Sequence, residues 1–142
     1  MPMNRHLIII GLIALTGCAN LNSVQDYAPV ANVVTIHDDP GGPIGDYIRL
    51  AADIKRNGES IKLDGRCASA CTILTSVGAD KICVTDKASL VFHSASDSRA
   101  NGVLIAYYPT QVNEWVARQG GLTLTLITLD GPELREMFKT CS

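Results

Sequence analysis

An apolar run at the N-terminus is the feature that most constrains this chain. A short polar segment containing Arg5 and no acidic residue precedes the uninterrupted stretch Leu7–Leu15. A membrane-spanning helix needs about 20 apolar residues, and this stretch is too short for that. A positive segment followed by a short apolar run is typical of a secretory signal peptide, which is removed and takes no part in the fold. A buried core helix is the alternative interpretation of the same residues.

The apolar run ends in Leu15-Thr16-Gly17-Cys18, which resembles the lipobox of bacterial lipoproteins. The resemblance implies a diacylglyceryl group on the Cys18 thiol and cleavage just before it, so residues 1–17 are a lipoprotein signal peptide. Several acyl chains give stable membrane attachment, which a single chain does not. By the same resemblance, Ala19 favours transfer to the outer membrane. We therefore expect a lipid-anchored protein of the bacterial cell envelope that faces the periplasm, with residues 18–32 as its tether.

Four cysteines remain when Cys18 carries lipid, and these are Cys67, Cys71, Cys83 and Cys141. An even number in an oxidising compartment indicates disulfide bonds, and four cysteines allow three pairings. The sequence does not fix the pairing, although we expect a bridge from Cys67 or Cys71 to Cys83 first. Zinc binding is the alternative, but no Cys-x-x-Cys occurs and no histidine lies at ligand spacing. We therefore expect neither a metal nor a cofactor.

The composition indicates one globular domain over residues 33–142. The 142 residues are 46% hydrophobic and 18% charged, with a formal charge of −2. This apolar content is sufficient for one core, and the length is typical of a single domain. Lysines and arginines are scattered rather than clustered, and the balance is slightly acidic. The composition therefore gives no electrostatic reason to expect nucleic acid as a partner.

Strand and helix patterns alternate from residue 33 onward. β-branched runs or alternating apolar residues predict strands at 33–36, 61–64, 81–85 and 89–93. Apolar residues at helical spacing, each set followed by glycine, predict helices over 44–57, 70–78 and 112–119. This order predicts an α/β layer with parallel strands.

The remaining segments give weaker patterns. Small polar residues predict a loop over 94–102. Leu122–Leu129 is apolar and rich in threonine, and its pattern is ambiguous between strand and helix. Asp130-Gly131-Pro132-Glu133 resembles a capping box, which predicts that a last short helix begins there.

Three segments carry residues suited to acyl-transfer chemistry. Pro40-Gly41-Gly42 lies at a strand-to-helix turn, where backbone amides can bind an oxyanion or a phosphate. Ser69 lies between a strand and an apolar helix, where its hydroxyl is exposed at the start of the helix. His93 ends a strand at the edge of the core, where a general base would be needed. Each residue also has an ordinary alternative: a tight turn, a helix N-cap serine and a half-buried structural histidine.

Together these segments resemble the core of the Clp-type serine proteases. The resemblance rests on Asp39-Pro40-Gly41-Gly42, on Ser69 before an apolar helix and on His93 after a strand, and it covers about residues 33–94. The Cys-x-Ser-x-Cys sequence around Ser69 is similar to secreted Clp-like proteins of bacteria within the Clp/crotonase superfamily. The resemblance implies a layered α/β fold with a short parallel sheet and flanking helices. By the same resemblance, we expect the mature chain to be shorter than a full Clp-type subunit, without one early strand-and-helix unit and without the ring-forming insertion.

The same resemblance implies roles for individual residues. Ser69 would be the nucleophile and His93 its base. The oxyanion hole would be formed by the backbone amides of Gly42 (or Gly41) and Ala70.

The third member of the triad is less clear from the sequence. The family uses an aspartate late in the chain, and only Asp130 lies in roughly the right place, where it also has a capping explanation. Asp97 is close to His93 in sequence but falls in the expected loop.

Two functions follow from the sequence. One is a membrane-anchored serine hydrolase, a peptidase acting on peptide or protein substrates. The other is a catalytically silent, disulfide-stapled lipoprotein with a binding or structural role in the envelope. A homo-oligomer is compatible with either.

Overall fold

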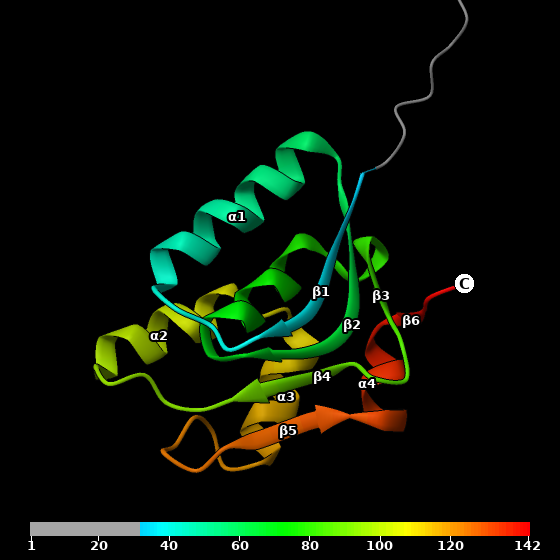
Figure 1. Ribbon diagram of the computed structural model, residues 1–142. Helices are drawn as coiled ribbons and strands as arrows, with labels where there is room; N and C mark the ends of the chain where they lie inside the picture. Colours follow the sequence, from blue (N-terminus) through cyan, green and yellow to red (C-terminus); the bar gives the residue numbers. More distant parts are fainter. Residues whose placement is uncertain (1–31) are drawn as a thin grey trace, which may run out of the picture.

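The computed structural model describes residues 32–142 (Figure 1). The predicted signal peptide, Cys18 and the predicted tether up to residue 31 lie outside the described residues. The first half of the described chain is built from β1 (Val33–Asp39), α1 (Ile44–Asn57), β2 (Ser60–Ala68), the 3-10 helices η1 (Ser69–Val77) and η2 (Ala79–Lys81), and β3 (Ile82–Val84). The second half is built from β4 (Ser89–Phe92), α2 (Ser98–Tyr107), α3 (Thr110–Arg118), β5 (Ile127–Asp130), α4 (Gly131–Met137) and β6 (Lys139–Thr140).

The long strand β2 organises the sheet. β1 runs parallel to β2 along one of its edges. On the other edge, the first half of β2 pairs with β3 and the second half with β4, both in parallel. β6 extends the sheet beyond β3, and β5 pairs antiparallel with β4. The sheet therefore divides at the point where the neighbour of β2 changes from β3 to β4. Figure 1 shows that the sheet curls.

A bulge in β2 accounts for this division. The β1–β2 register shifts between Ile36 and Asp38, so that β2 carries one more residue than β1 across this stretch. At the shift, a Cβ on Gly65 would lie only 1.5 Å from the carbonyl oxygen of His37. Only glycine fits there, and bulges of this kind bend a strand and increase its twist. Beyond the bulge, the end of β2 pairs with β4.

The 3-10 helix η1 lies at the centre of the core. It contacts α1, α2, β2 and β4, and all its residues except Ser69 and Ser76 are buried. A helix that is apolar all round is expected inside a protein rather than on its surface. A second part of the core forms around Phe92, whose ring lies 5.4 Å from that of Tyr108 and 5.7 Å from that of Trp115.

Most of the predicted elements are confirmed. The strands at 33–36, 61–64, 81–85 and 89–93 correspond to β1–β4, and the parallel pairing among them is as expected. The three predicted helices correspond to α1, η1 and α3, although η1 is a 3-10 helix. The ambiguous segment Leu122–Leu129 contributes the first part of β5.

The predicted loop over 94–102 is wrong in its second half, because α2 begins at Ser98. Asp97 is the N-cap of this helix, and its carboxylate accepts a hydrogen bond from the Arg99 amide at 2.9 Å. The buried Leu104 anchors the helix on the core. Tertiary contact thus stabilises a helix whose small polar first turn gave no helical pattern.

The last helix begins where the capping-box sequence predicted, but the box itself is not formed. Asp130 is the N-cap of α4 and makes no side-chain capping bond. Glu133 accepts a hydrogen bond from the indole Nε1 of Trp115 at 3.2 Å instead.

The disulfides join Cys67 to Cys71 and Cys83 to Cys141, so the expected bridge from Cys67 or Cys71 to Cys83 is wrong. The reason is the register of β2. Cys83 lies level with Lys62 near the start of β2, whereas Cys67 follows five residues later, about 17 Å further along a strand. Cys141 follows β6, the strand that pairs with β3, and therefore lies close to Cys83.

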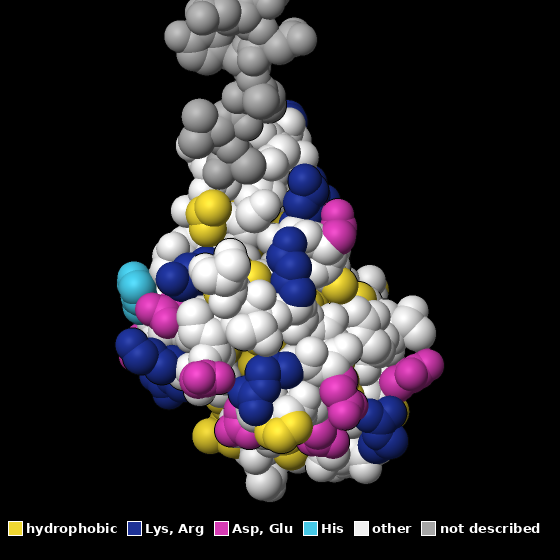
Figure 2. All heavy atoms as spheres, turned by 90° about the vertical axis from the view of Figure 1, so that its right-hand side faces the viewer, with side chains coloured by type: hydrophobic (Ala, Val, Ile, Leu, Met, Phe, Trp, Pro, Cys, Tyr) yellow, Lys and Arg dark blue, Asp and Glu magenta, His cyan; other side chains and the backbone are white. Residues whose placement is uncertain are grey.

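The described surface gives no sign of a metal site or a transmembrane helix. Within residues 32–142 no helix is long and apolar enough to span a membrane, and no group of three or more potential ligands could hold a metal ion. On the face shown in Figure 2, positive and negative side chains are mixed. This face therefore offers no basic patch of the kind that binds nucleic acid.

The two disulfides are expected to stabilise the fold unequally. Cys67 and Cys71 are 4 residues apart, and Cys83 and Cys141 are 58 apart. By loop-closure entropy, the short bridge contributes about 2 kcal/mol and the long one about 4 kcal/mol. We expect the double alanine variant at Cys83 and Cys141 to lose more free energy of unfolding than the one at Cys67 and Cys71. Urea unfolding without reductant measures both, and equal losses would contradict the expectation.

Candidate active site

The register of three parallel strands brings the predicted site segments to one edge of the sheet. Asp39 at the end of β1 is level with Cys67 of β2, and Ala68 of β2 is level with Val91 of β4. Gly41 lies two residues after Asp39, Ser69 two residues after Cys67, and His93 two residues after Val91. The three segments are far apart in sequence but meet at this edge. The carboxyl ends of parallel strands are the usual place for a ligand site in an open α/β sheet.

Ser69 adopts a strained backbone conformation. Its φ is +55°, and it is the only non-glycine residue with positive φ in the described part of the chain. Such a conformation costs about 1–3 kcal/mol and persists only where its surroundings fix it. Ala68, and not Ser69, is the N-cap of η1, and the Ser69 hydroxyl makes no hydrogen bond within residues 32–142. The ordinary explanation of Ser69 as a helix-capping serine therefore does not hold.

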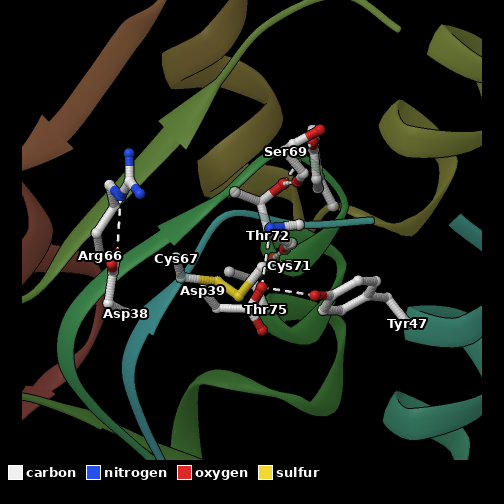
Figure 3. The surroundings of a disulfide bond; sticks show 11 residues. Asp38, Asp39, Tyr47, Arg66, Cys67, Ser69, Cys71, Thr72 and Thr75 are labelled. Carbon is white, nitrogen blue, oxygen red and sulfur yellow. Dashed lines mark hydrogen bonds and ion pairs between the residues drawn. A yellow bond between two sulfur atoms is a disulfide. The ribbon is translucent and has the colours of Figure 1, made fainter. Parts of the chain in front are cut away.

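The Ser69 backbone is held from both sides (Figure 3). The Cys67–Cys71 disulfide closes the segment that contains it. Thr72 Oγ1 donates a hydrogen bond to the Ser69 carbonyl oxygen at 2.6 Å. Thr72 Oγ1 also lies 2.7 Å from the hydroxyl oxygen of Tyr108. Because the Thr72 hydroxyl donates its one proton to Ser69, the Tyr108 hydroxyl is the donor in this second bond. Burial raises the pKa of Tyr108 to about 12, and the Thr72 hydrogen bond opposes this in part, so the hydroxyl remains a donor.

Gly41 packs directly against the Ser69 segment. Its φ is +86°, and a Cβ on it would lie 2.6 Å from the Ala68 oxygen and 2.8 Å from the Ser69 Cβ. Its amide donates to Asp39 Oδ1 at 2.8 Å and so is not free to bind an oxyanion. The Tyr47 hydroxyl from α1 donates to the same oxygen at 2.5 Å. Burial, followed by the hydrogen bond and charge of Asp39, raises the pKa of Tyr47 to about 12 and keeps it a donor.

Two backbone amides remain for an oxyanion at this edge. The Gly42 amide bonds to no described residue. The Ala70 amide lies in the first turn of η1, where amides have no intrahelical partner. The Ala70 nitrogen would be 3.0 Å from a Cβ on Gly41, which places it beside the glycine turn.

His93 and Ser69 line one pocket of about 380 Å3, together with Gly42. The rest of the lining is apolar or small, and no charged side chain contributes: Ile44, Ala95, Ser96, Ala100 and Leu104. The His93 ring bonds through Nδ1 to the Ser94 carbonyl oxygen at 2.8 Å. A carbonyl can only accept, so Nδ1 carries the proton and a neutral ring presents Nε2 as a base.

The structure does not bring Asp130 to His93. In the antiparallel β4–β5 ladder Asp130 is level with Ser89, whereas Ile127 is level with Phe92, next to His93. Asp130 therefore lies at the opposite end of β4, about 13 Å along the strand. Asp97 caps α2, and within residues 32–142 no carboxylate forms an ion pair with His93.

The other described histidine, His37, lies away from the pocket. Its Nδ1 is 3.2 Å from Asp64 Oδ2. Thr85 Oγ1 donates to Asp64 at 2.8 Å, and this hydrogen bond is the main cause that lowers the pKa of Asp64. His93 is therefore the histidine placed to act at this site.

Several residues that support the site were not predicted from the sequence. Tyr47 and Thr72 occupy ordinary helical positions. Asn101, whose side-chain oxygen accepts a hydrogen bond from the Ala95 amide, falls in the segment predicted as a loop. Asp39 had a local signal, because Asp-x-Gly spacing is typical of a turn in which the carboxylate binds the backbone amide two residues later. The hydrogen bonds of the other three follow no such local pattern and appear only in the fold.

Comparison with known proteins identifies the fold. No protein-family model and no curated protein sequence matches the chain. A mutant of ClpP1 from Listeria monocytogenes is similar in structure, with a TM-score of 0.52 and 13% identity, over 75% of this chain and 70% of that one. A peptidase from Plasmodium falciparum matches with a TM-score of 0.48 and 13% identity, over 74% of this chain and 71% of that one. The chain therefore has a trimmed Clp-like fold, as the sequence predicted.

The two glycines of the turn are expected to differ in their tolerance of alanine. Gly41→Ala adds a Cβ at positive φ and within 3 Å of Ala68 and Ser69, so we expect a loss of at least about 2 kcal/mol in free energy of unfolding. Gly42→Ala is the matched control, because its Cβ would meet only the Tyr47 ring at 3.7 Å. We expect it to stay within about 0.5 kcal/mol of the wild type. Urea unfolding measures both, and a tolerated Gly41→Ala would show that the close packing is not required.

Proposed function

We propose that this chain is a serine hydrolase of the cell envelope, acting on peptide or protein substrates. One observation carries the proposal: Ser69, held in a strained conformation with an unbonded hydroxyl, shares a pocket with His93 and Gly42. The Clp-like fold supports a peptidase in particular, since the similar structure is that of a ClpP1 protein. The uncharged lining of the pocket is suited to a small or aliphatic side chain of the substrate.

In the proposed mechanism, Ser69 Oγ attacks the scissile carbonyl carbon while its proton passes to His93 Nε2. The carbonyl oxygen becomes an oxyanion, which the Gly42 and Ala70 amides stabilise. His93 then returns the proton to the leaving amine as the C–N bond breaks, leaving an acyl group on Ser69. Water, deprotonated by His93, attacks the acyl group, and Ser69 recovers its proton. Each oxyanion donor of this kind is worth roughly 10²–10³ in rate.

The catalytically silent alternative is supported by a specific observation. Within residues 32–142 Ser69 and His93 form no hydrogen bond with each other, and no carboxylate pairs with His93. Such bonds often tighten only when substrate is present, which is why the enzyme remains our first proposal. The labelling experiment below distinguishes the two.

We further propose that the chain is anchored to the outer membrane, periplasm-facing, through lipid on Cys18. The lipobox-like sequence supports this. The position of the site is compatible with it, because the chain enters the fold at Val33, at the start of β1, while Gly41 and Ser69 follow the opposite ends of β1 and β2. A seven-residue strand is about 20 Å long, so the pocket lies at the far end of β1 from Val33, the residue at which the proposed tether would join the fold.

Ser69 should react with an activated fluorophosphonate probe when the full chain is folded and its disulfides are intact. We expect Ser69→Ala to abolish labelling and His93→Ala to slow it by roughly 10²–10⁴, because the general base is lost. Ser89→Ala on β4 and Asp130→Asn should label at the wild-type rate, since both residues lie at the other end of the strand. If the folded wild type is not labelled at Ser69, the hydrolase is excluded and the silent alternative remains.

Lipid attachment is tested in a bacterial host fed radiolabelled palmitate. We expect incorporation into the wild-type chain and none into Cys18→Ala, because the thiol that carries the diacylglyceryl group is absent. Cys67→Ala/Cys71→Ala is the control for a general effect of removing cysteines. Undiminished incorporation into Cys18→Ala would contradict anchoring at that residue.

A further inference from the structure

The peptide between Ser94 and Ala95 occupies the position where a carboxylate would orient His93. Its carbonyl oxygen accepts the bond from His93 Nδ1 at 2.8 Å, and its N–H donates to the side-chain oxygen of Asn101 at 2.6 Å. Asn101 lies on α2, so a separate element holds this peptide. We propose that Asn101 is a positioning residue, which fixes the Ser94–Ala95 peptide so that its carbonyl holds His93 in the Nδ1–H tautomer. The inference rests on the proposed function for its catalytic meaning.

The geometry of a trans peptide explains how Asn101 acts at a distance. The C=O and N–H of one peptide lie in one plane and point in opposite directions. A hydrogen bond to the N–H therefore fixes the direction of the C=O on the other side. Because hydrogen bonds in a chain polarise one another, the bond to Asn101 also makes the carbonyl a better acceptor for His93.

The preceding peptide is fixed as well. The Ser94 amide donates to the Thr123 carbonyl oxygen at 2.6 Å. The carbonyl that faces His93 is thus flanked by two held amides, one bonded to the segment before β5 and the other to α2. Because this carbonyl is held in one direction, it can keep the His93 proton on Nδ1. A carbonyl that rotated freely could not do so.

A peptide carbonyl supplies only part of what a carboxylate supplies. It fixes the ring orientation and the proton on Nδ1, which leaves Nε2 free for Ser69. It carries no full negative charge, so it stabilises the imidazolium that forms during the reaction less strongly. Asn101 therefore affects the orientation and the tautomer of the His93 ring, and it touches no reacting atom.

The test uses Asn101→Ala, which removes the side-chain acceptor, and Asn101→Asp, which keeps an oxygen at the same place. Nitrogen NMR of the His93 ring reports which nitrogen is protonated at neutral or higher pH. We expect Nδ1–H in the wild type and in Asn101→Asp, and a mixture of tautomers in Asn101→Ala. We expect Asn101→Ala to lower the maximal rate of fluorophosphonate labelling about tenfold, with the half-saturating probe concentration unchanged.

Asn113→Ala is the matched control. Asn113 is also a partly buried asparagine bonded to the backbone, through Nδ2 to the Ile105 and Tyr108 carbonyls at 2.9 and 3.0 Å. It bonds to the C-terminal end of α2 and touches neither His93 nor the Ser94–Ala95 peptide, so its loss should cost stability without moving the His93 tautomer. An effect shared by both alanine variants would mean that Asn101 acts through general stability, and this would overturn the inference.

The two proposals fail in different ways. If the wild type is not labelled at Ser69, the hydrolase proposal fails, while the NMR measurement still tests the position of His93. If His93 carries its proton on Nε2 in the wild type, or keeps Nδ1–H in folded Asn101→Ala, the role of Asn101 is overturned whether or not Ser69 reacts.

Discussion

The contact between Gly65 of β2 and the carbonyl oxygen of His37 on β1 determines the rest of the structure. A Cβ at residue 65 would lie 1.5 Å from that oxygen, so only glycine lets the two strands stay paired across the bulge. The bulge allows β2 to face β3 with its first half and β4 with its second. Because the register then resumes with Asp39 level with Cys67, the glycine turn meets Ser69, and β4 brings His93 to the same edge. The bulge thus sets the level at which the glycine turn meets Ser69, and the β2–β4 register sets the level of His93.

The strain at Ser69 is best understood through the groups that maintain it. An N-cap serine would be in the extended region and need no support, whereas Ser69 is held in the left-handed region by a disulfide, by Thr72 and by the packing of Gly41. Gly41 is in turn held by Asp39, which also binds Tyr47 of α1. These interactions offset a cost of about 1–3 kcal/mol. The fold therefore directs several independent contacts to a single serine, as expected where the position of a hydroxyl matters.

The sequence predicted what depends on local pattern and missed what depends on register. Strands and helices followed from periodicity, and the Clp-like fold from short motifs at the ends of strands. The disulfide pairs could not be derived, because they depend on which half of β2 faces Cys83. For the same reason the resemblance, which rests on the order of residues in the chain, pointed to Asp130, whereas the antiparallel register of β5 carries Asp130 to the other end of β4. The whole of α2 was missed, because contact with the core stabilises this helix more than its propensity does.

The absence of a carboxylate partner for His93 among the described residues has a physical consequence for the proposed chemistry. A triad aspartate does two things, since it selects the histidine tautomer and it stabilises the charged imidazolium. The Ser94 carbonyl performs the first through a bond of 2.8 Å and contributes little to the second. Orientation is the larger need, because a histidine with its proton on the wrong nitrogen cannot accept one from Ser69 at all. In the proposed mechanism, a fixed peptide therefore takes the place of the acid in orienting His93, and the proton transfer is slower because the imidazolium is less stabilised.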